Sequence, residues 1–247
     1  MTRDAQPALD PDDLPLAGTV VVDVSRMLPG AVLARCLIDL GARLIKIEDP
    51  HTGELLRHTP PLVDGTGAGF HAFFRGAESV GLDLRTPDGA AALRKIAQRA
   101  DVLVESFRPG TMARYGLPED QLLAESPRLV LCSLPGFADS SKVGHDLNFT
   151  GLTGLLRSLR DEGIVGLQLA DVTSGLLACS SILAALLRRA RTGRGGRLQQ
   201  PLLTGPLPFL TWAFAEHGLG HAGAAAGAPL GEGPGEEGQR AGEERLL

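Results

Sequence analysis

The first fifty residues alternate between strand-like and helix-like segments, and this alternation limits the chain to a few architectures. Residues 19–24 form a β-branched run, residues 30–41 have the apolar spacing of a helix, and residues 43–48 are apolar again. A strand, a helix and a second strand in this order make a βαβ unit, in which the two strands are parallel. We therefore expect a parallel sheet with helices packed on its faces.

The same alternation continues further along the chain. The predicted strands are 79–84, 102–105 and 128–133, and the predicted helices are 87–99, 147–156 and 173–189. Strands that alternate with helices over this length are typical of α/β proteins. The predicted fold class is therefore α/β, a Rossmann-like parallel sheet flanked by helices.

Three segments lack a clear hydrophobic period. Residues 49–72 are rich in Pro, Gly, Thr and His and are predicted to form a long loop. The GTGAG within this segment follows no convincing strand and opens no clear helix, so a flexible loop is preferred over a phosphate-binding turn. RTGRGGR, after the last predicted helix, is interpreted as a glycine-rich basic turn, and the segment from Gly218 onward as a disordered tail.

Charge and cysteine content narrow the function classes. The net charge of −5 argues against a nucleic-acid-binding protein, because such proteins use surplus Lys and Arg to neutralise phosphates. The three cysteines are far apart and show no metal-ligand or disulfide spacing, which suits a reducing compartment. The N-terminus has no apolar signal region, and no apolar run of roughly 18 residues is evident. We expect a cytoplasmic protein that does not enter a membrane.

Two side chains in the second half of the chain are candidates for acid–base chemistry. His145 follows the flexible Gly144, and Asp171 lies just before a predicted long helix, in LADVTSG. A carboxylate at that place can also cap the helix by accepting backbone N–H bonds, and a histidine can be a structural imidazole with its hydrogen bonds satisfied. From the residues alone, the catalytic and the structural interpretations both stay open.

Several segments, in one order along the chain, resemble the CoA-transferase family III, which contains CoA transferases and α-methylacyl-CoA racemases. They are VVDVSRMLPG, GARLIKIEDP, RGAESVGLDLR, ADVLVESFRPGTMARYGL, SPRLVLCSLPGF, GHDLNFTGLTG, LADVTSG and AALLRRARTGRG. The resemblance runs from about Leu16 to Arg197 and is greatest to the racemases. It implies a large domain over residues 16–217, preceded by an extension over 1–15 and followed by a tail over 218–247.

The resemblance implies two reactions that both involve Asp171. CoA transferases of the family use the matching aspartate as a nucleophile, which forms an acyl anhydride and then a thioester with the enzyme. The racemases use that aspartate together with the histidine of a GHDxNY segment to move a proton at the α-carbon. Because GHDLNF is similar to the racemase form, the resemblance implies a racemase of 2-methylacyl-CoA thioesters, with a CoA transferase as the alternative.

Inversion of a stereocentre by proton transfer needs a base on one face of the carbon and an acid on the other. His145 and Asp171 are the expected pair. An imidazole, with an ordinary pKa of about 6.5, can take a proton near neutral pH, whereas a carboxylic acid has to be kept protonated by burial or hydrogen bonding. The enolate oxygen requires preorganised donors, such as backbone N–H groups at the start of a helix.

CoA carries phosphates, an adenine and a long pantetheine arm, so its site should combine arginines with apolar walls. The resemblance implies the following CoA-binding residues: Leu82, Asp83, Leu84, Arg85, Ser106, Phe107, Arg108, Arg114, Gly144, Asp146, Leu147, Asn148 and Phe149. No metal and no cofactor beyond the CoA of the substrate are expected. The expected partners are an acyl-CoA and a second copy of the chain, in an interlocked homodimer.

The sequence departs from the family pattern at four places. Asp49 stands where racemases have an arginine that meets the CoA phosphates, so we expect it to repel them. Phe74 and Ala77 replace an asparagine and a basic residue, and the segment 137–144 is shorter than usual. The chain also ends where family members continue into a smaller second domain. We therefore expect a C-terminally truncated chain, and an inactive CoA-binding or scaffold protein is a third hypothesis.

Overall fold

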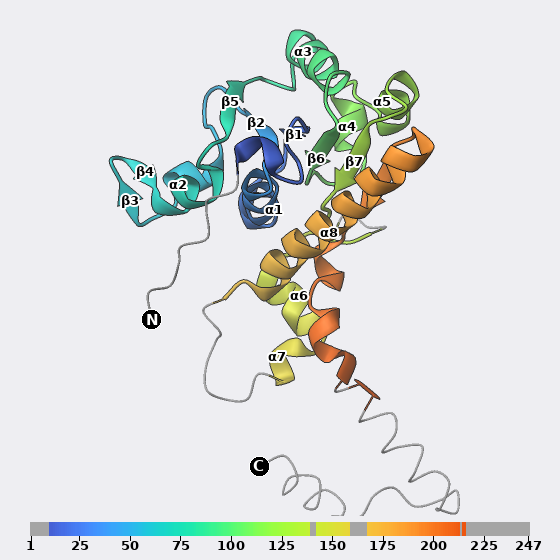
Figure 1. The fold of residues 1–247 in the computed structure, drawn as a ribbon. Coiled ribbons are helices and arrows are strands. Elements are labelled where there is room, and N and C mark those ends of the chain that lie inside the picture. Colours follow the sequence, from blue (N-terminus) through green and yellow to red (C-terminus); the bar gives the residue numbers. More distant parts are fainter. Residues whose placement is uncertain (1–9, 139–141, 159–166, 213, 216–247) are drawn as a thin grey trace, which may run out of the picture. The chain divides into compact units, whose positions relative to one another are not determined.

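The computed structural model describes residues 10–138, 142–158, 167–212 and 214–215 (Figure 1). Residues Met1–Leu207 form one compact unit, and Pro208–Leu247 form a second. The predicted tail at 218–247 and most of the predicted extension at 1–15 lie outside the described residues.

The first unit is built around a six-stranded sheet with the order β5-β2-β1-β6-β7-β8, in which every neighbouring pair of strands is parallel. The strands are β1 (Val20–Asp23), β2 (Arg43–Glu48), β5 (Glu78–Gly81), β6 (Val102–Glu105), β7 (Val130–Ser133) and β8 (Gly196–Gln199). The prediction of an α/β fold with a parallel sheet is therefore confirmed.

Helices cover both faces of this sheet (Figure 1). The α-helices are α1 (Met27–Asp39), α2 (Ala68–Phe74), α3 (Pro87–Ala97), α4 (Thr111–Arg114), α5 (Glu119–Glu125), α6 (Asp146–Leu152), α7 (Leu155–Ser158) and α8 (Leu169–Thr192). Short 3-10 helices lie at η1 (Pro11–Asp13), η2 (Leu55–His58) and η3 (Leu202–Thr204). The single helix predicted over 147–156 is instead two helices, because Gly154, with a φ of 84°, turns the chain between them.

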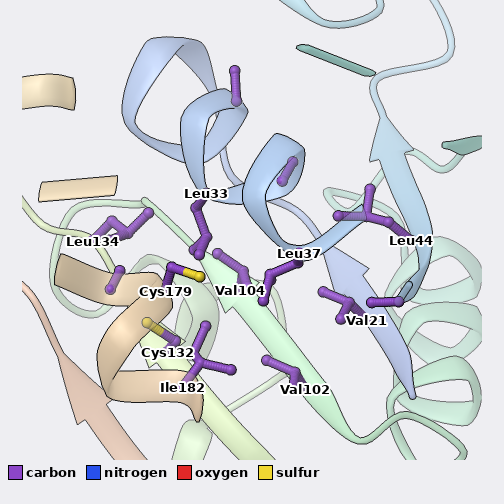
Figure 2. Close-up of a cluster of buried hydrophobic side chains, with 14 of the residues drawn as sticks. Val21, Leu33, Leu37, Leu44, Val102, Val104, Cys132, Leu134, Cys179 and Ile182 are labelled. Carbon is purple, nitrogen blue, oxygen red and sulfur yellow. The ribbon is translucent and has the colours of Figure 1, made fainter. Parts of the chain in front are cut away.

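Alternate residues of each central strand enter two different cores, as the two-residue period of a strand requires. Val21 and Val104 join the core beneath α1 and α8, whereas Val22 and Leu103 join the core beneath α3 and α5. Figure 2 shows the first core, where the sheet meets side chains of α1 and α8: Leu33, Leu37, Cys179 and Ile182. The central strands are thus buried on both faces, which explains their continuous apolar sequence.

The basic segment RTGRGGR is only partly a turn, so its interpretation as a glycine-rich turn is corrected. Gly193, with a φ of 73°, ends α8, and the chain then forms β8 from Gly196 onward. A Cβ at Gly195 would lie 2.0 Å from the Leu129 carbonyl oxygen, so glycine is needed for the close approach to β7. This edge strand was missed because glycines and arginines hide its period.

The predicted loop over 49–72 also contains regular structure, which corrects that prediction. It holds η2 and a short antiparallel hairpin of β3 (Leu62–Val63) and β4 (Thr66–Gly67). The GTGAG piece ends this hairpin and opens α2, with Gly67 at the N-cap. A Cβ at Gly67 would lie 2.0 Å from the Leu56 carbonyl oxygen. Close packing therefore accounts for this glycine.

Helix α8 is long and apolar enough to cross a membrane by length and composition alone. Its buried residues lie on one stripe, which packs on α1 and on the sheet within the same unit. The two helices approach closely at Gly175, where a Cβ would lie 2.7 Å from the Pro29 carbonyl oxygen and 2.9 Å from Val32 Cβ. A glycine at this crossing lets the backbones touch.

Replacing Gly175 by alanine is expected to lower the free energy of unfolding by about 1–3 kcal/mol, because the added methyl overpacks the α1–α8 contact. Urea unfolding should show a lower midpoint with an unchanged slope. Gly151→Ala is the matched control, since a Cβ at this helical glycine meets no atom within 4 Å. Equal midpoints for both variants would contradict the role of Gly175.

Candidate functional site

A large cavity lies at the carboxyl edge of the parallel sheet, where ligands of open α/β sheets bind. It has a volume of about 650 Å³. Segments that follow β1, β6 and β7 form part of its wall, and the remainder comes from the chain before α6, from the starts of α6 and α8, and from η3. The lining residues include Arg26, Met27, Pro29, Ser106, Phe107, Arg108, Leu134, Gly136, Lys142, Gly144, His145, Asp146, Leu147, Leu167, Gln168, Asp171 and Leu202.

Asp171 lies in the first turn of α8 and lines this cavity. The N-cap of the helix is Gln168, so the interpretation of Asp171 as the N-cap is wrong. The backbone N–H of Asp171 donates to Asp146 Oδ1 at 2.9 Å. This bond ties the first turn of α8 to the first residue of α6 and brings two acidic residues together.

Burial and, to a lesser extent, the nearby Asp146 carboxylate together raise the pKa of the Asp171 carboxyl to about 7. In the part of the chain that the structure describes, no hydrogen bond to the Asp171 carboxyl opposes this rise. A carboxyl with this pKa is present in both protonation states near neutral pH, so it can give and accept a proton.

His145 lies at the N-cap position of α6 and lines the same cavity. Its backbone N–H donates to Asn148 Oδ1 at 2.8 Å, which anchors the start of α6. The residue is exposed. His145 is therefore not a buried core histidine, and its ring is accessible to a molecule in the cavity.

A second, smaller cavity of about 170 Å³ adjoins the first, because Arg26 and Phe107 line both. The Arg26 guanidinium carbon lies 5.9 Å from the centroid of the Phe107 ring. Four of the predicted CoA-binding residues line this smaller cavity: Leu82, Asp83, Leu84 and Arg85. Asp171 lines the larger cavity and Arg85 the smaller one, on either side of the shared residues Arg26 and Phe107.

The structure brings most of the predicted CoA-binding residues to these two cavities, but three lie elsewhere. Phe149 is fully buried, with its ring centroid 5.4 Å from that of Phe137, so it packs behind the wall. Arg114 donates to Thr111 Oγ1 at 2.7 Å and lines a different cavity. Asn148 accepts the His145 N–H and lines neither cavity. These three residues line neither of the two cavities, and their contact with CoA stays a prediction.

Asp49 lines the smaller cavity and is paired rather than isolated. Its Oδ2 lies 3.2 Å from the nearer terminal nitrogen of Arg85, and the Nε of Arg85 lies 2.7 Å from Asp83 Oδ1. Arg85 thus bridges two carboxylates, which lowers the pKa of Asp83 below its ordinary value. This pairing partly offsets the repulsion expected between Asp49 and the CoA phosphates. Arg85, in turn, already shares its positive charge between the carboxylates of Asp49 and Asp83.

Sequence reasoning missed several lining residues, above all Arg26 and Met27. The signal was present, because both residues directly follow a predicted strand in VVDVSRMLPG, and chain segments that follow parallel strands meet at one edge of the sheet. Gln168 and Leu202 carried no such signal. They reach the wall through the tertiary placement of α8 and η3.

The raised pKa of Asp171 predicts how stability depends on pH. In the folded chain the pKa of the Asp171 carboxyl is above its ordinary value of 3.8, whereas the unfolded chain has the ordinary value. Ionisation of this carboxyl therefore lowers the free energy of unfolding increasingly as the pH rises from about 4 to 7. Asp171→Asn removes this cost and is expected to raise the free energy of unfolding at pH 8 by on the order of 2–4 kcal/mol. Near pH 4 the two proteins should be almost equal in urea unfolding. A difference that is independent of pH would contradict the raised pKa.

These features define a class of protein: a parallel α/β domain with a titratable, partly apolar cavity at the carboxyl edge of its sheet. The chain belongs to the CoA-transferase family III, whose family model matches residues 16–238. The ordered segments that resemble this family in sequence thus lie in one folded unit, and the resemblance to the family is confirmed.

Curated relatives include both kinds of enzyme. The succinate–glutarate CoA-transferase of Agrobacterium fabrum is 34% identical over 205 residues, and the α-methylacyl-CoA racemase of Homo sapiens is 35% identical over 199 residues. The matches cover 76% and 77% of this chain, and 51% and 48% of the relatives. The chain therefore spans about half the length of the curated relatives it matches.

Solved structures of family members have the same fold. A CaiB/BaiF family protein from Brucella suis matches with a TM-score of 0.77 and 33% identity, over 87% of this chain and 59% of that one. Rv3272 of Mycobacterium tuberculosis matches with a TM-score of 0.76 and 31% identity, over 83% and 59%. Because the relatives include both transferases and racemases, membership of the family leaves the reaction open.

Proposed function

We propose that this site racemises 2-methylacyl-CoA thioesters by proton transfer at the α-carbon, with Asp171 and His145 as the two proton-transfer groups. The observation that carries the proposal is the Asp171 carboxyl, whose pKa of about 7 matches the pH at which it would work. His145 lines the same cavity from the start of a different helix. Two groups on separate elements suit a reaction that needs an acid and a base on opposite faces of one carbon.

In the proposed reaction, one group takes the α-proton and leaves an enolate of the thioester, and the other returns a proton to the opposite face. No bond to carbon other than C–H breaks, and the net charge is conserved. The α8 N-terminus places its positive dipole end at the cavity, where it would stabilise the enolate oxygen. The apolar lining residues Met27, Leu147 and Leu202 suit an acyl chain.

The proposal is tested by the stereochemistry of the product. Incubation of the protein with (2R)-2-methylacyl-CoA, followed by hydrolysis and chiral chromatography, is expected to yield the 2S acid until the two isomers are nearly equal. Heat-denatured protein serves as the control for spontaneous racemisation. A product that keeps its configuration while CoA still binds in calorimetry would contradict the proposal.

A CoA transferase is the second candidate, supported by the ionised fraction of Asp171 near neutral pH and by the transferases among the relatives. Here the carboxylate attacks the thioester carbonyl and expels CoA as thiolate, which leaves an acyl–aspartyl anhydride. The thiolate then attacks the aspartyl carbonyl, so that the acid is released and an aspartyl thioester remains. Hydroxylamine trapping or mass detection of that thioester identifies this route.

The remaining expectations stay predictions. The interlocked homodimer, the cytoplasmic location and the dependence on no cofactor other than the CoA of the substrate belong to this proposal. Binding of CoA without racemisation and without an aspartyl thioester would favour the third hypothesis, an inactive CoA-binding or scaffold protein.

A further inference from the structure

A lysine is buried beneath the segment that joins β1 to α1. The Lys46 side chain is only 1% exposed, and its Nζ lies 3.2 Å from Asp23 Oδ2 and 3.3 Å from Glu54 Oε2. The ammonium group also donates to the Ser25 carbonyl oxygen and lies 5.1 Å from the centroid of the Phe74 ring. A charge this deeply buried requires close partners of opposite charge, and both carboxylates are themselves buried.

The free oxygens of the two carboxylates hold the backbone of the same segment. Asp23 Oδ1 accepts the Ser25 N–H at 2.7 Å, and Glu54 Oε1 accepts the Met27 N–H at 3.0 Å. The N–H between them, that of Arg26, donates to Ser106 Oγ at 2.9 Å. Three consecutive N–H groups are thus bound by side chains, and two of these side chains are bound to Lys46.

The segment needs this outside support because its backbone conformation is unusual. Met27 has a φ of 66°, in the left-handed region that residues other than glycine rarely adopt. The chain also folds back tightly, since a Cβ at Gly30 would lie 1.8 Å from Ser25 Oγ. Arg26 and Met27 are held in this conformation at the wall of the cavity that contains Asp171.

We infer that Lys46, Asp23 and Glu54 are positioning residues of the acyl-CoA site, which act by fixing Arg26 and Met27 in the cavity wall. The inference rests on the proposed function insofar as the ligand is an acyl-CoA. Lys46 and Asp23 line neither cavity, so they act only through the segment, whereas Glu54 also lines the smaller cavity. A glutamine at position 54 keeps nearly the size of that side chain at the cavity wall and therefore controls for this second contact. A merely structural triad would change stability without changing the binding of the ligand.

Two variants of Glu54 separate these roles, because both remove its charge and leave Lys46 paired with Asp23. Glu54→Gln keeps an oxygen that can accept the Met27 N–H, whereas Glu54→Leu has none. We expect the KM for the 2-methylacyl-CoA to rise at least ~10-fold in Glu54→Leu and less than ~3-fold in Glu54→Gln, with a smaller change in kcat. Leu93→Ala, in the core on the other face of the sheet, should lower the unfolding midpoint without raising KM.

Hydrogen–deuterium exchange provides a readout that needs no ligand. The peptide that contains Met27 should exchange faster in Glu54→Leu than in Glu54→Gln, at a pH where all variants are folded. The inference would be overturned if Glu54→Leu has the wild-type KM, or if KM rises equally in Glu54→Leu and Leu93→Ala. It would also be overturned if exchange of the Met27 peptide is unchanged.

If the wild-type protein does not racemise the substrate, its calorimetric Kd for the same thioester replaces KM. A Kd that weakens in Glu54→Leu then supports the positioning role while the proposed reaction fails. A Kd unchanged in Glu54→Leu, or no measurable binding to the wild-type protein, overturns the inference itself.

Discussion

Asp171→Asn is expected to lower kcat/KM for the 2-methylacyl-CoA at least ~10³-fold, because it removes one of the two proposed proton-transfer groups. The amide has nearly the same shape but neither gives nor accepts a proton at neutral pH. The backbone bond from residue 171 to Asp146 does not involve the replaced side chain, so the start of α8 is expected to stay in place. CoA should therefore bind with a Kd within ~3-fold of the wild-type value.

The measurement is the initial rate of racemisation together with calorimetric binding of CoA, for wild type and variant. Asp88→Asn is the matched control, because this exposed aspartate lies in the first turn of α3 and outside both cavities. Its rate should equal that of the wild type. An Asp171→Asn protein that keeps more than about a tenth of the wild-type activity would exclude Asp171 from proton transfer.

His145→Ala is expected to lower the racemisation rate ~10²- to 10⁴-fold, which is the usual decrease in rate when a general acid or base is removed. The bond from the backbone N–H of residue 145 to Asn148 Oδ1 is kept in the alanine variant, so this part of the α6 cap is preserved. Formation of an aspartyl thioester should be much less affected, because the transferase route needs no imidazole. His71→Ala, on α2 and outside both cavities, serves as the control.

This substitution also separates the two proposed reactions. Loss of racemisation in His145→Ala together with retained thioester formation would assign both reactions to Asp171 and only one to His145. Wild-type racemisation in the variant would mean that another group takes the α-proton. Asp146, which lines the cavity beside Asp171, would be the next residue to replace.

The sheet could be predicted from sequence wherever the hydrophobic period is strong. The β1-α1-β2 unit has apolar runs that are buried on both faces, so its boundaries agree within a few residues. Strand β8 was missed because Gly196 and Arg197 carry no strand period, and its position depends on pairing with β7. Similarly, only the positive φ of Gly154 separates α6 from α7.

The site could be predicted in part. His145 and Asp171 were found from family motifs, and both line one cavity. The raised pKa of Asp171 could not be predicted, because it comes from burial and from Asp146, which is 25 residues away in sequence. The Lys46 network was equally hidden, since an isolated lysine in an apolar strand gives no indication that Asp23 and Glu54 meet it. Sequence patterns identify elements, whereas electrostatic environments follow from their tertiary arrangement.

Exchange of the α-proton in deuterium oxide tests the proposed role of Asp171 and His145 most directly. The account predicts that the wild-type protein incorporates deuterium at the α-carbon of a 2-methylacyl-CoA, and that Asp171→Asn and His145→Ala each lose most of this exchange. Mass spectrometry and proton NMR of the recovered thioester measure it. A wild-type protein that binds the thioester but exchanges no α-proton, while an aspartyl thioester accumulates, would contradict the racemase assignment.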